Sequence, residues 1–331
     1  MRKAVMTTLS CLFLAAAFPT AAYAQTLVAG GQVVGIQIKT DGVMVAGVAP
    51  VETAEGSRSP AGDAGLRQGD FIMEIDGRAV DGAGDLISAV GRLAGKAATL
   101  TVLRQGQTLS VTVQPALSRE DQWMLGMWLR DGISGIGTVT FYDPATGLFG
   151  ALGHSISDFD TGVVVPLGKG SISEAEIVGV TPGSPGAPGE LNGCADMGRV
   201  LGSVDANTGH GIFGHSDTPL PGRPLETGQV AAGPASILAT VDGRTVRQYA
   251  VEINRLYRDS DGQHLMLTVT DPELLGRTGG IVQGMSGSPI LQNGKLVAAV
   301  THVFVNQPDK GYGISIQDML RSAPAEPEQA A

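Results

Sequence analysis

The chain has 331 residues, 43% hydrophobic and only 16% charged, with 48 glycines and a formal net charge of −10. This composition indicates a globular protein of one to three domains, rich in strands and tight turns, and argues against a disordered chain. The acidic balance argues against nucleic-acid binding, which depends on basic side chains that contact phosphates.

The first 24 residues have the pattern of a secretion signal. Arg2 and Lys3 precede an apolar stretch over residues 9–18, and a small-x-small sequence at 22–24 comes before Gln25. We therefore expect a signal peptide over residues 1–24 and a mature protein that is exported to the periplasm or the extracellular space. An uncleaved anchor is the alternative, although the apolar stretch is short for a bilayer span.

The cysteines and histidines indicate no metal site and no cofactor. Removal of the signal would leave Cys194 as the single cysteine, so no intramolecular disulfide is expected. None of the five histidines has a spacing typical of zinc ligands; they are His154, His210, His215, His264 and His302.

Residues 25–116 have the pattern of a compact α+β module. The run 65–80 alternates at strand period and turns at Asp76-Gly77, a strong hairpin dipeptide. Residues 84–93 have apolar side chains at helical spacing, and 98–104 and 107–113 form a second predicted hairpin.

The remainder of the chain is predicted to be almost entirely β. Residues 117–130 are expected to form a linker or short helix in which Trp123 and Trp128 pack. Short strand-like runs separated by glycine and proline turns then continue to residue 316, which favours a β-barrel or sandwich. The tail over residues 322–331 is expected to be disordered.

A serine with the surroundings of a nucleophile lies in the run 284–290, GMSGSPI. Gly284 and Gly287 allow tight backbone turns on both sides of Ser286, so that the N–H groups of Gly284 and Ser286 can point into one oxyanion-binding space. Ser288 is a rival outside the Gly-x-Ser-Gly frame and ranks lower. A plain turn is the alternative for the whole run.

A serine nucleophile needs a base, and His154 is the first candidate because it ends the apolar run 149–154. His215 is a rival, since Gly214-His215-Ser216 repeats the local sequence around His154. A histidine at a strand end is more commonly only a polar terminus.

Two blocks of sequence carry a resemblance to a known family. Residues 138–154 (TVTFYDPATGLFGALGH) and 279–306 (GGIVQGMSGSPILQNGKLVAAVTHVFVN) resemble the SpoIVB peptidases, which are trypsin-like serine peptidases with a PDZ domain in front. The resemblance extends over about residues 30–320 and is weakest over 179–229. It implies a PDZ domain over residues 25–116 and a double β-barrel peptidase domain over 117–321.

The resemblance also implies site residues. Asp271 would complete a triad with His154 and Ser286, although an Asp-Pro pair also commonly caps a helix. His302 matches the family block, with either a cleft-wall or a structural role. The loop Val34-Gly35-Ile36 would bind the carboxylate of a peptide, with the helix over 84–93 as the other wall.

The function expected on these grounds is that of an exported serine endopeptidase with a regulatory PDZ domain. Its expected partners are a protein or peptide substrate, the chain itself through self-cleavage, a C-terminal peptide ligand of the PDZ domain, and a membrane-associated protein. Two alternatives stay open. One is an HtrA-like quality-control protease, in which the peptidase precedes the PDZ domains, and the other is a non-catalytic PDZ-based binding protein.

Overall fold

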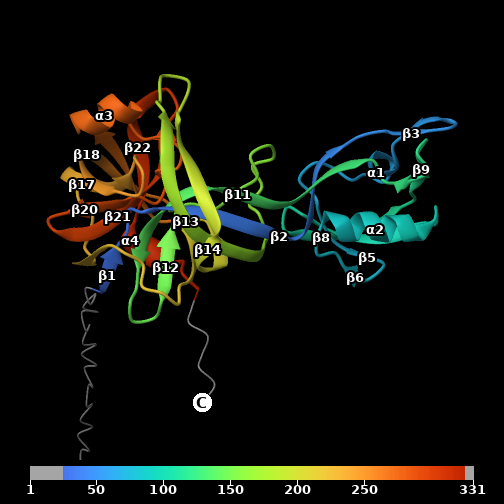
Figure 1. Cartoon of the computed structure of the whole chain (residues 1–331), viewed down its shortest axis with the longest axis horizontal. Coiled ribbons are helices and arrows are strands. Elements are labelled where there is room, and N and C mark those ends of the chain that lie inside the picture. The colour runs from blue at the N-terminus through green and yellow to red at the C-terminus, as the bar shows by residue number, and fades with distance from the viewer. Residues whose placement is uncertain (1–24, 325–331) are drawn as a thin grey trace, which may run out of the picture.

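The computed structural model describes residues 25–324. The predicted signal peptide and the end of the predicted tail, residues 325–331, lie outside the described residues. In the described part no helix has both the length and the apolar character needed to cross a membrane. The architecture is mostly β, as predicted, with strands arranged in two barrels on one side of the molecule and a smaller α+β part on the other (Figure 1).

The first barrel is a ring of six antiparallel strands. Its closure depends on β2, which pairs with β11 on one edge and with β13 on the other. The strands in ring order are β2 (Val33–Val48), β11 (Met127–Tyr142), β12 (Leu148–Ala151), β15 (Gly211–His215), β14 (Glu190–Thr208) and β13 (Leu167–Thr181). The short strands β1 (Thr26–Ala29) and β16 (Arg223–Glu226) add to this sheet beside β11.

The second barrel is also closed and six-stranded. Its strands in ring order are β17 (Gly233–Thr240), β18 (Val246–Arg258), β19 (Gln263–Val269), β22 (Gln307–Ser315), β21 (Lys295–Phe304) and β20 (Pro289–Gln292). Alternating aliphatic side chains of these strands fill its interior. The helix α3 (Pro272–Thr278) follows β19, and α4 (Ile316–Arg321) is the last helix of the described chain. Two consecutive six-stranded barrels confirm the predicted trypsin-like architecture.

The smaller part contains the remaining elements and its own apolar core. Leu86 and Val90 anchor α2 against strands β5 and β7. Its elements are β3 (Val51–Thr53), β4 (Gly56–Arg58), α1 (Pro60–Asp63), β5 (Phe71–Ile75), β6 (Arg78–Ala79), α2 (Ala83–Leu93), β7 (Ala98–Arg104), β8 (Gln107–Val113), β9 (Ala116–Leu117) and β10 (Trp123–Met124). The long strands β2 and β11 join it to the barrels (Figure 1).

The prediction that Val34-Gly35-Ile36 forms a carboxylate-binding loop is wrong. These residues lie inside β2, where Val34 pairs with Gly137 on one side and Glu174 on the other. Both edges of the strand are occupied, and the Val34 and Ile36 side chains are buried in the first barrel. No strand edge is left there for a peptide.

The strand pairing also crosses the predicted boundary between residues 116 and 117. The first half of β2 belongs to the first barrel, whereas Met127–Arg130 of β11 pairs with Met44–Val48 in the smaller part. The predicted linker or short helix over 117–130 is therefore β9, β10 and the start of β11. The two parts exchange strands, which the linear order of the sequence does not indicate.

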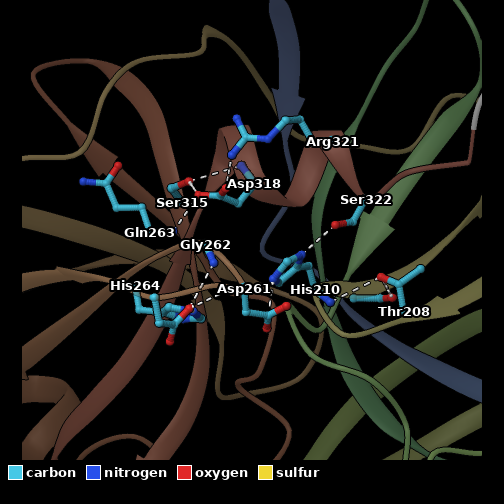
Figure 2. Close-up of polar contacts among 12 residues, drawn as sticks. Thr208, His210, Asp261, Gly262, Gln263, His264, Ser315, Asp318, Arg321 and Ser322 are labelled. Atoms are coloured by element: carbon cyan, nitrogen blue, oxygen red, sulfur yellow. Dashed lines mark hydrogen bonds and ion pairs between the residues drawn. The ribbon is translucent and has the colours of Figure 1, made fainter.

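The end of the described chain is held by a polar network around Asp318 in α4 (Figure 2). The Ser315 hydroxyl caps the helix by accepting a bond from the Asp318 N–H at 3.1 Å. The Asp318 carboxylate in turn accepts bonds from the Gln263 N–H and from Arg321. The network fastens α4 to the second barrel.

A second contact in the same view includes a serine, a histidine and an aspartate. His210 Nδ1 lies 2.6 Å from Ser322 Oγ, and its Nε2 lies 3.3 Å from Asp261 Oδ2 (Figure 2). None of these residues lines the cleft that contains Ser286. The arrangement therefore has a structural role, in which His210 connects the residue after α4 with the turn before β19. Ser322 therefore makes a defined contact, whereas the sequence predicts that the disordered tail begins at this residue.

Candidate active site

The loop that carries Ser286 is shaped by two glycines and by the first barrel. Gly284 and Gly287 have φ angles of 94° and 95°, which side-chain-bearing residues rarely adopt. A Cβ on Gly287 would lie 2.0 Å from the Thr138 carbonyl oxygen. Only glycine allows β11 to approach the loop this closely.

Two threonines of β11 hold the loop by its carbonyl groups. The Thr138 N–H donates to the Ser286 oxygen at 3.1 Å and the Thr138 hydroxyl to the Gly284 oxygen at 2.8 Å. The Thr140 hydroxyl donates to the Gly287 oxygen at 2.7 Å. With its carbonyls turned toward β11, the loop leaves the N–H groups of Gly284 and Ser286 without an acceptor among residues 25–324. These two amides are the predicted oxyanion hole, and the geometry leaves them available for it.

Ser286 and His154 line one cleft of about 470 Å³, which the two barrels build together. Ser286 comes from the loop before β20 and His154 from the turn after β12. His302, on β21, lines the same cleft, and its ring centroid lies 4.5 Å from that of His154. The structure therefore brings the predicted nucleophile and base together and adds a second imidazole beside them.

The hydrogen bond of His154 sets its tautomer. Its Nδ1 lies 2.8 Å from the carbonyl oxygen of Ser155. A carbonyl only accepts hydrogen bonds, so the proton is on Nδ1 and Nε2 carries the free lone pair. This is the tautomer that a general base requires, and here a backbone carbonyl fixes it.

Both imidazoles of the cleft are uncharged near neutral pH. Burial lowers the pKa of His154 below its usual value, and the bond to the Ser155 carbonyl opposes this only in part. Partial desolvation, with the neighbouring His154 as a second cause, lowers the pKa of His302 to about 4. His154 can therefore accept a proton over the whole neutral range.

The Ser286 hydroxyl is not bonded to His154 in this structure. Ser286 Oγ donates to the carbonyl oxygen of Thr301 at 2.6 Å. A peptide carbonyl cannot take up the serine proton, so attack on a substrate requires rotation of the hydroxyl toward His154. The structure represents a resting arrangement of the site.

The two rival candidates from the sequence, His215 and Ser288, do not line the cleft. His215 is on β15, where its Nδ1 lies 2.7 Å from Asp205 Oδ2, and it does not line the cleft. Ser288 is fully buried and its hydroxyl has no partner among the described residues. Neither can replace His154 or Ser286 without a large rearrangement.

The assignment of Asp271 as the third member of the triad is wrong. It is the N-cap of α3, and its Oδ1 accepts bonds from the Glu273 and Leu274 N–H groups at 3.0 and 3.1 Å. Its Oδ2 accepts a bond from the Ala250 N–H, and it lines a different depression from the one that contains Ser286. The alternative interpretation, a helix cap at an Asp-Pro pair, is the one the structure supports.

A capping role for Asp271 predicts a loss of stability without a loss of activity. We expect Asp271→Ala to lower the free energy of unfolding by about 1 kcal/mol, because two N–H groups of α3 lose their acceptor. Urea unfolding measures this, alongside the turnover of a peptide substrate at a temperature at which both proteins are folded. A loss of turnover by several orders of magnitude in a stable Asp271→Ala protein would restore the triad assignment.

Sequence reasoning missed several groups of this site. The Ser155 carbonyl is a backbone atom and leaves no signal in residue types. Thr138 and Thr140 belong to the resembling block 138–154, and their spacing of two places both side chains on one face of a strand. The sequence is compatible with two roles for His302, and its place in the cleft favours the wall role.

Comparison with known proteins agrees with this picture. The family model of SpoIVB peptidase S55 matches residues 121–320, and that of the PDZ domain matches residues 33–114. A Mesorhizobium japonicum protein named as zinc metalloprotease mll0638 is 36% identical over 78 residues, which are 24% of this chain. The chain spans only about a fifth, 21%, of that relative's length.

Solved structures share parts of the fold at low similarity. The PDZ domain of the SdrC-like protein Lmo2051 of Listeria monocytogenes is 22% identical, covers 28% of this chain and 90% of its own, and has a TM-score of 0.23. The Rv3671c protease of M. tuberculosis in its active form is 13% identical, covers 58% of this chain and 76% of its own, and has a TM-score of 0.36.

Proposed function

Because the chain belongs to the SpoIVB peptidase S55 family and carries a PDZ domain, we propose that this serine endopeptidase is exported and cleaves itself or a partner protein in a regulatory step. The observation that supports the chemistry is the cleft in which Ser286 and His154 meet beside two unpaired amides. Export rests on the sequence of residues 1–24, and a membrane-associated partner is part of the proposal.

The reaction follows from the groups in the cleft. Ser286 turns from Thr301 toward His154, gives its proton to Nε2 and forms a bond from Oγ to the carbonyl carbon of the peptide. The oxyanion accepts bonds from the N–H groups of Gly284 and Ser286. Protonated His154 then gives the proton to the leaving amine, and water repeats the sequence on the acyl-enzyme.

The imidazolium that forms on His154 has a backbone carbonyl on Nδ1 instead of a carboxylate. A carbonyl dipole orients the ring and offers partial negative charge, without the full charge of an aspartate. We infer a serine–histidine dyad oriented by Ser155. His302 stays neutral above its pKa of about 4 and so adds no positive charge beside the imidazolium.

The cleft walls favour one class of substrate. Within residues 25–324, no Asp, Glu, Lys or Arg lines the cleft. The surfaces next to the Ser286 loop are aliphatic, formed by Ile281, Val282, Val303 and Val305. A charged substrate side chain would lose its hydration there and find no ion partner, at a cost of several kcal/mol. We propose that the enzyme cleaves extended peptides next to uncharged, apolar residues.

A mixture of synthetic decapeptides, analysed by mass spectrometry after incubation with the full chain, tests both proposals. We expect cleavage next to Val, Leu, Ile, Ala or Met, at least tenfold faster than next to Lys, Arg, Asp or Glu. Cleavage mainly beside charged residues would refute the substrate class alone. The absence of all cleavage, with the Ser286 hydroxyl also unreactive toward a fluorophosphonate, would refute the peptidase function.

A substitution in the aliphatic cleft wall gives a second test of the proposed substrate class. Val303→Asp introduces a carboxylate into the aliphatic wall and is expected to allow new cleavage beside Lys and Arg. Val246→Asp is the matched control, because Val246 is an exposed strand residue away from the cleft. An unchanged cleavage profile in folded Val303→Asp would mean that this wall does not contact the substrate side chain.

A further inference from the structure

Residues 156–165, which follow His154 closely, form a hairpin at the rim of the active-site cleft. The Asp158 N–H donates to the Val163 carbonyl at 2.9 Å, and the Gly162 N–H donates back to the Asp158 carbonyl at 2.8 Å. Gly162 has a φ of 67°, a conformation that suits glycine at the turn. The tip of the hairpin is therefore the segment 158–162.

A buried carboxylate fixes the shape of the tip. The Asp158 side chain is buried, and its Oδ1 accepts bonds from the N–H and the hydroxyl of Thr161, both at 3.0 Å. Its Oδ2 accepts a bond from Arg130 of β11, which also donates to Asp160 at 3.0 Å. Both carboxylate oxygens of Asp158 are thus satisfied, and their partners hold the turn in one conformation.

The base of the hairpin is held from two further directions. On β14, the Asn207 side chain accepts a bond from the Ile156 N–H at 2.8 Å and donates to the carbonyls of Ile156 and Val165 at 2.9 and 3.0 Å. On the smaller part, a Cβ at Gly69 would lie 3.5 Å from Val163 Cγ2, an ordinary packing distance. A segment held by the first barrel and by the smaller part presents its tip at a fixed position.

The tip carries an aromatic side chain. Phe159 lines the cleft that contains Ser286, although 94% of the residue is exposed to solvent. A single exposed apolar residue is common and carries no meaning by itself. Phe159 differs because it stands at the rim of the active-site cleft, on a hairpin that a buried ion pair holds in place. A ring held there gains apolar contact when a peptide enters and loses little conformational freedom.

The two walls of the cleft come from different barrels. The aliphatic wall next to the Ser286 loop belongs to the second barrel. The other wall belongs to the first barrel, where Ile133 and Ile156 line the cleft and Phe159 stands at the rim. His154 also comes from the first barrel, and it gives its proton to the leaving amine. The amine side of the substrate is therefore next to the wall that carries Phe159.

We propose that Phe159, together with Ile133 and Ile156, forms a subsite for an apolar side chain on the amine side of the scissile bond. The acyl-side residue contacts the aliphatic wall of the second barrel, and the first or second residue of the leaving peptide contacts Phe159. This inference rests on the proposed peptidase function and adds a second selection to it. Burying about 60 Å² of apolar surface against the ring corresponds to about a tenfold gain in binding.

Quenched fluorescent peptides with one constant acyl half and a varied leaving half test the subsite. For the wild-type full chain we expect kcat/KM to be at least tenfold higher with Leu or Phe at the first or second position after the cleaved bond than with Ser or Lys there. Phe159→Ala is expected to reduce this ratio at least fivefold, whereas Phe159→Tyr, which keeps the ring, is expected to preserve it. A merely structural role of Phe159 would lower all rates together and leave the ratio unchanged.

A gain of specificity gives a sharper result than a loss. Phe159→Asp places a carboxylate at the rim and is expected to raise the rate with Lys, relative to Leu, at least fivefold at the same position. Asp160→Asn is the matched control in the same hairpin: Asp160 is exposed, does not line the cleft, and meets Arg130 in a pair that solvent screens. We expect its preferences to equal those of the wild type.

Fluorophosphonate labelling of the wild type reports the serine chemistry independently, because the probe has no leaving peptide. With labelling present, unchanged ratios in both Phe159→Ala and Phe159→Asp would refute the subsite and leave the peptidase function in place. A change confined to the acyl-side preference would place Phe159 on the other side of the cleaved bond and refute the assignment. No labelling and no cleavage by the wild type would contradict the peptidase function, and the subsite with it.

Discussion

Ser286→Ala is expected to lower peptide hydrolysis about 10⁶-fold, the loss typical of removing a serine nucleophile. The physical reason is the loop geometry: the two flanking glycines and the bonds from Thr138 turn the amides of Gly284 and Ser286 outward. The oxyanion hole survives the substitution, but no other hydroxyl in the loop can reach the same carbonyl carbon. The measurement is the initial rate of cleavage of one peptide identified in the library experiment.

Ser288→Ala is the matched control for this substitution. The Ser288 side chain is fully buried two residues away, and its hydroxyl has no partner in the described chain. Replacing it removes an unsatisfied polar atom and leaves the volume almost unchanged, so we expect activity within about tenfold of wild type and no large loss of stability. A dead Ser288→Ala protein beside an active Ser286→Ala protein would reverse the assignment of the nucleophile.

Ser286 and His154, which the structure brings to one cleft, could be selected from sequence because their signals are local. The tight turns of the serine loop need glycines, and these are visible as Gly-Met-Ser-Gly in the run 284–287. His154 was recognisable only together with its surrounding block. The many short strands indicated only a barrel or a sandwich, and the family resemblance implied two barrels, with which the ring pairings of the structure agree.

Asp271 shows where a resemblance can mislead. The family resemblance implies a triad member, the Asp-Pro pair itself fits a helix cap, and sequence alone does not measure how far the carboxylate lies from His154. In the structure two N–H groups of α3 and one of β18 satisfy the carboxylate. The group that orients His154 is the backbone of Ser155, which no residue-type pattern can show.

The exchange of strands between the two parts could not be predicted from the sequence, for a different reason. Residues 33–48 fall within the predicted module 25–116, and nothing in their local sequence indicates that the run divides between two sheets. The structure instead extends them into one strand, β2, and β11 fills the position beside α2. Strand partners are long-range choices that depend on the whole sheet, so local periodicity does not determine them.

His154→Ala is expected to be about as inactive as Ser286→Ala, because the members of a catalytic unit fail together. His215→Ala should retain most activity, since its imidazole lies outside the cleft and contacts Asp205. Circular dichroism and thermal unfolding of each variant separate a lost base from a lost fold. If a folded His154→Ala protein hydrolysed the peptide at the wild-type rate, His154 would not be the general base.

The same base predicts how activity depends on pH. Protonation of His154 removes its basicity, and burial places its pKa below the usual value of 6.5. We therefore expect kcat/KM to stay level from pH 8 down to about 6.5 and to fall about tenfold per unit only at lower pH. His302 cannot cause this limb, because with a pKa of about 4 it remains neutral there. An acid limb centred above pH 7 would mean that an anionic partner, absent from this cleft, stabilises the imidazolium of His154.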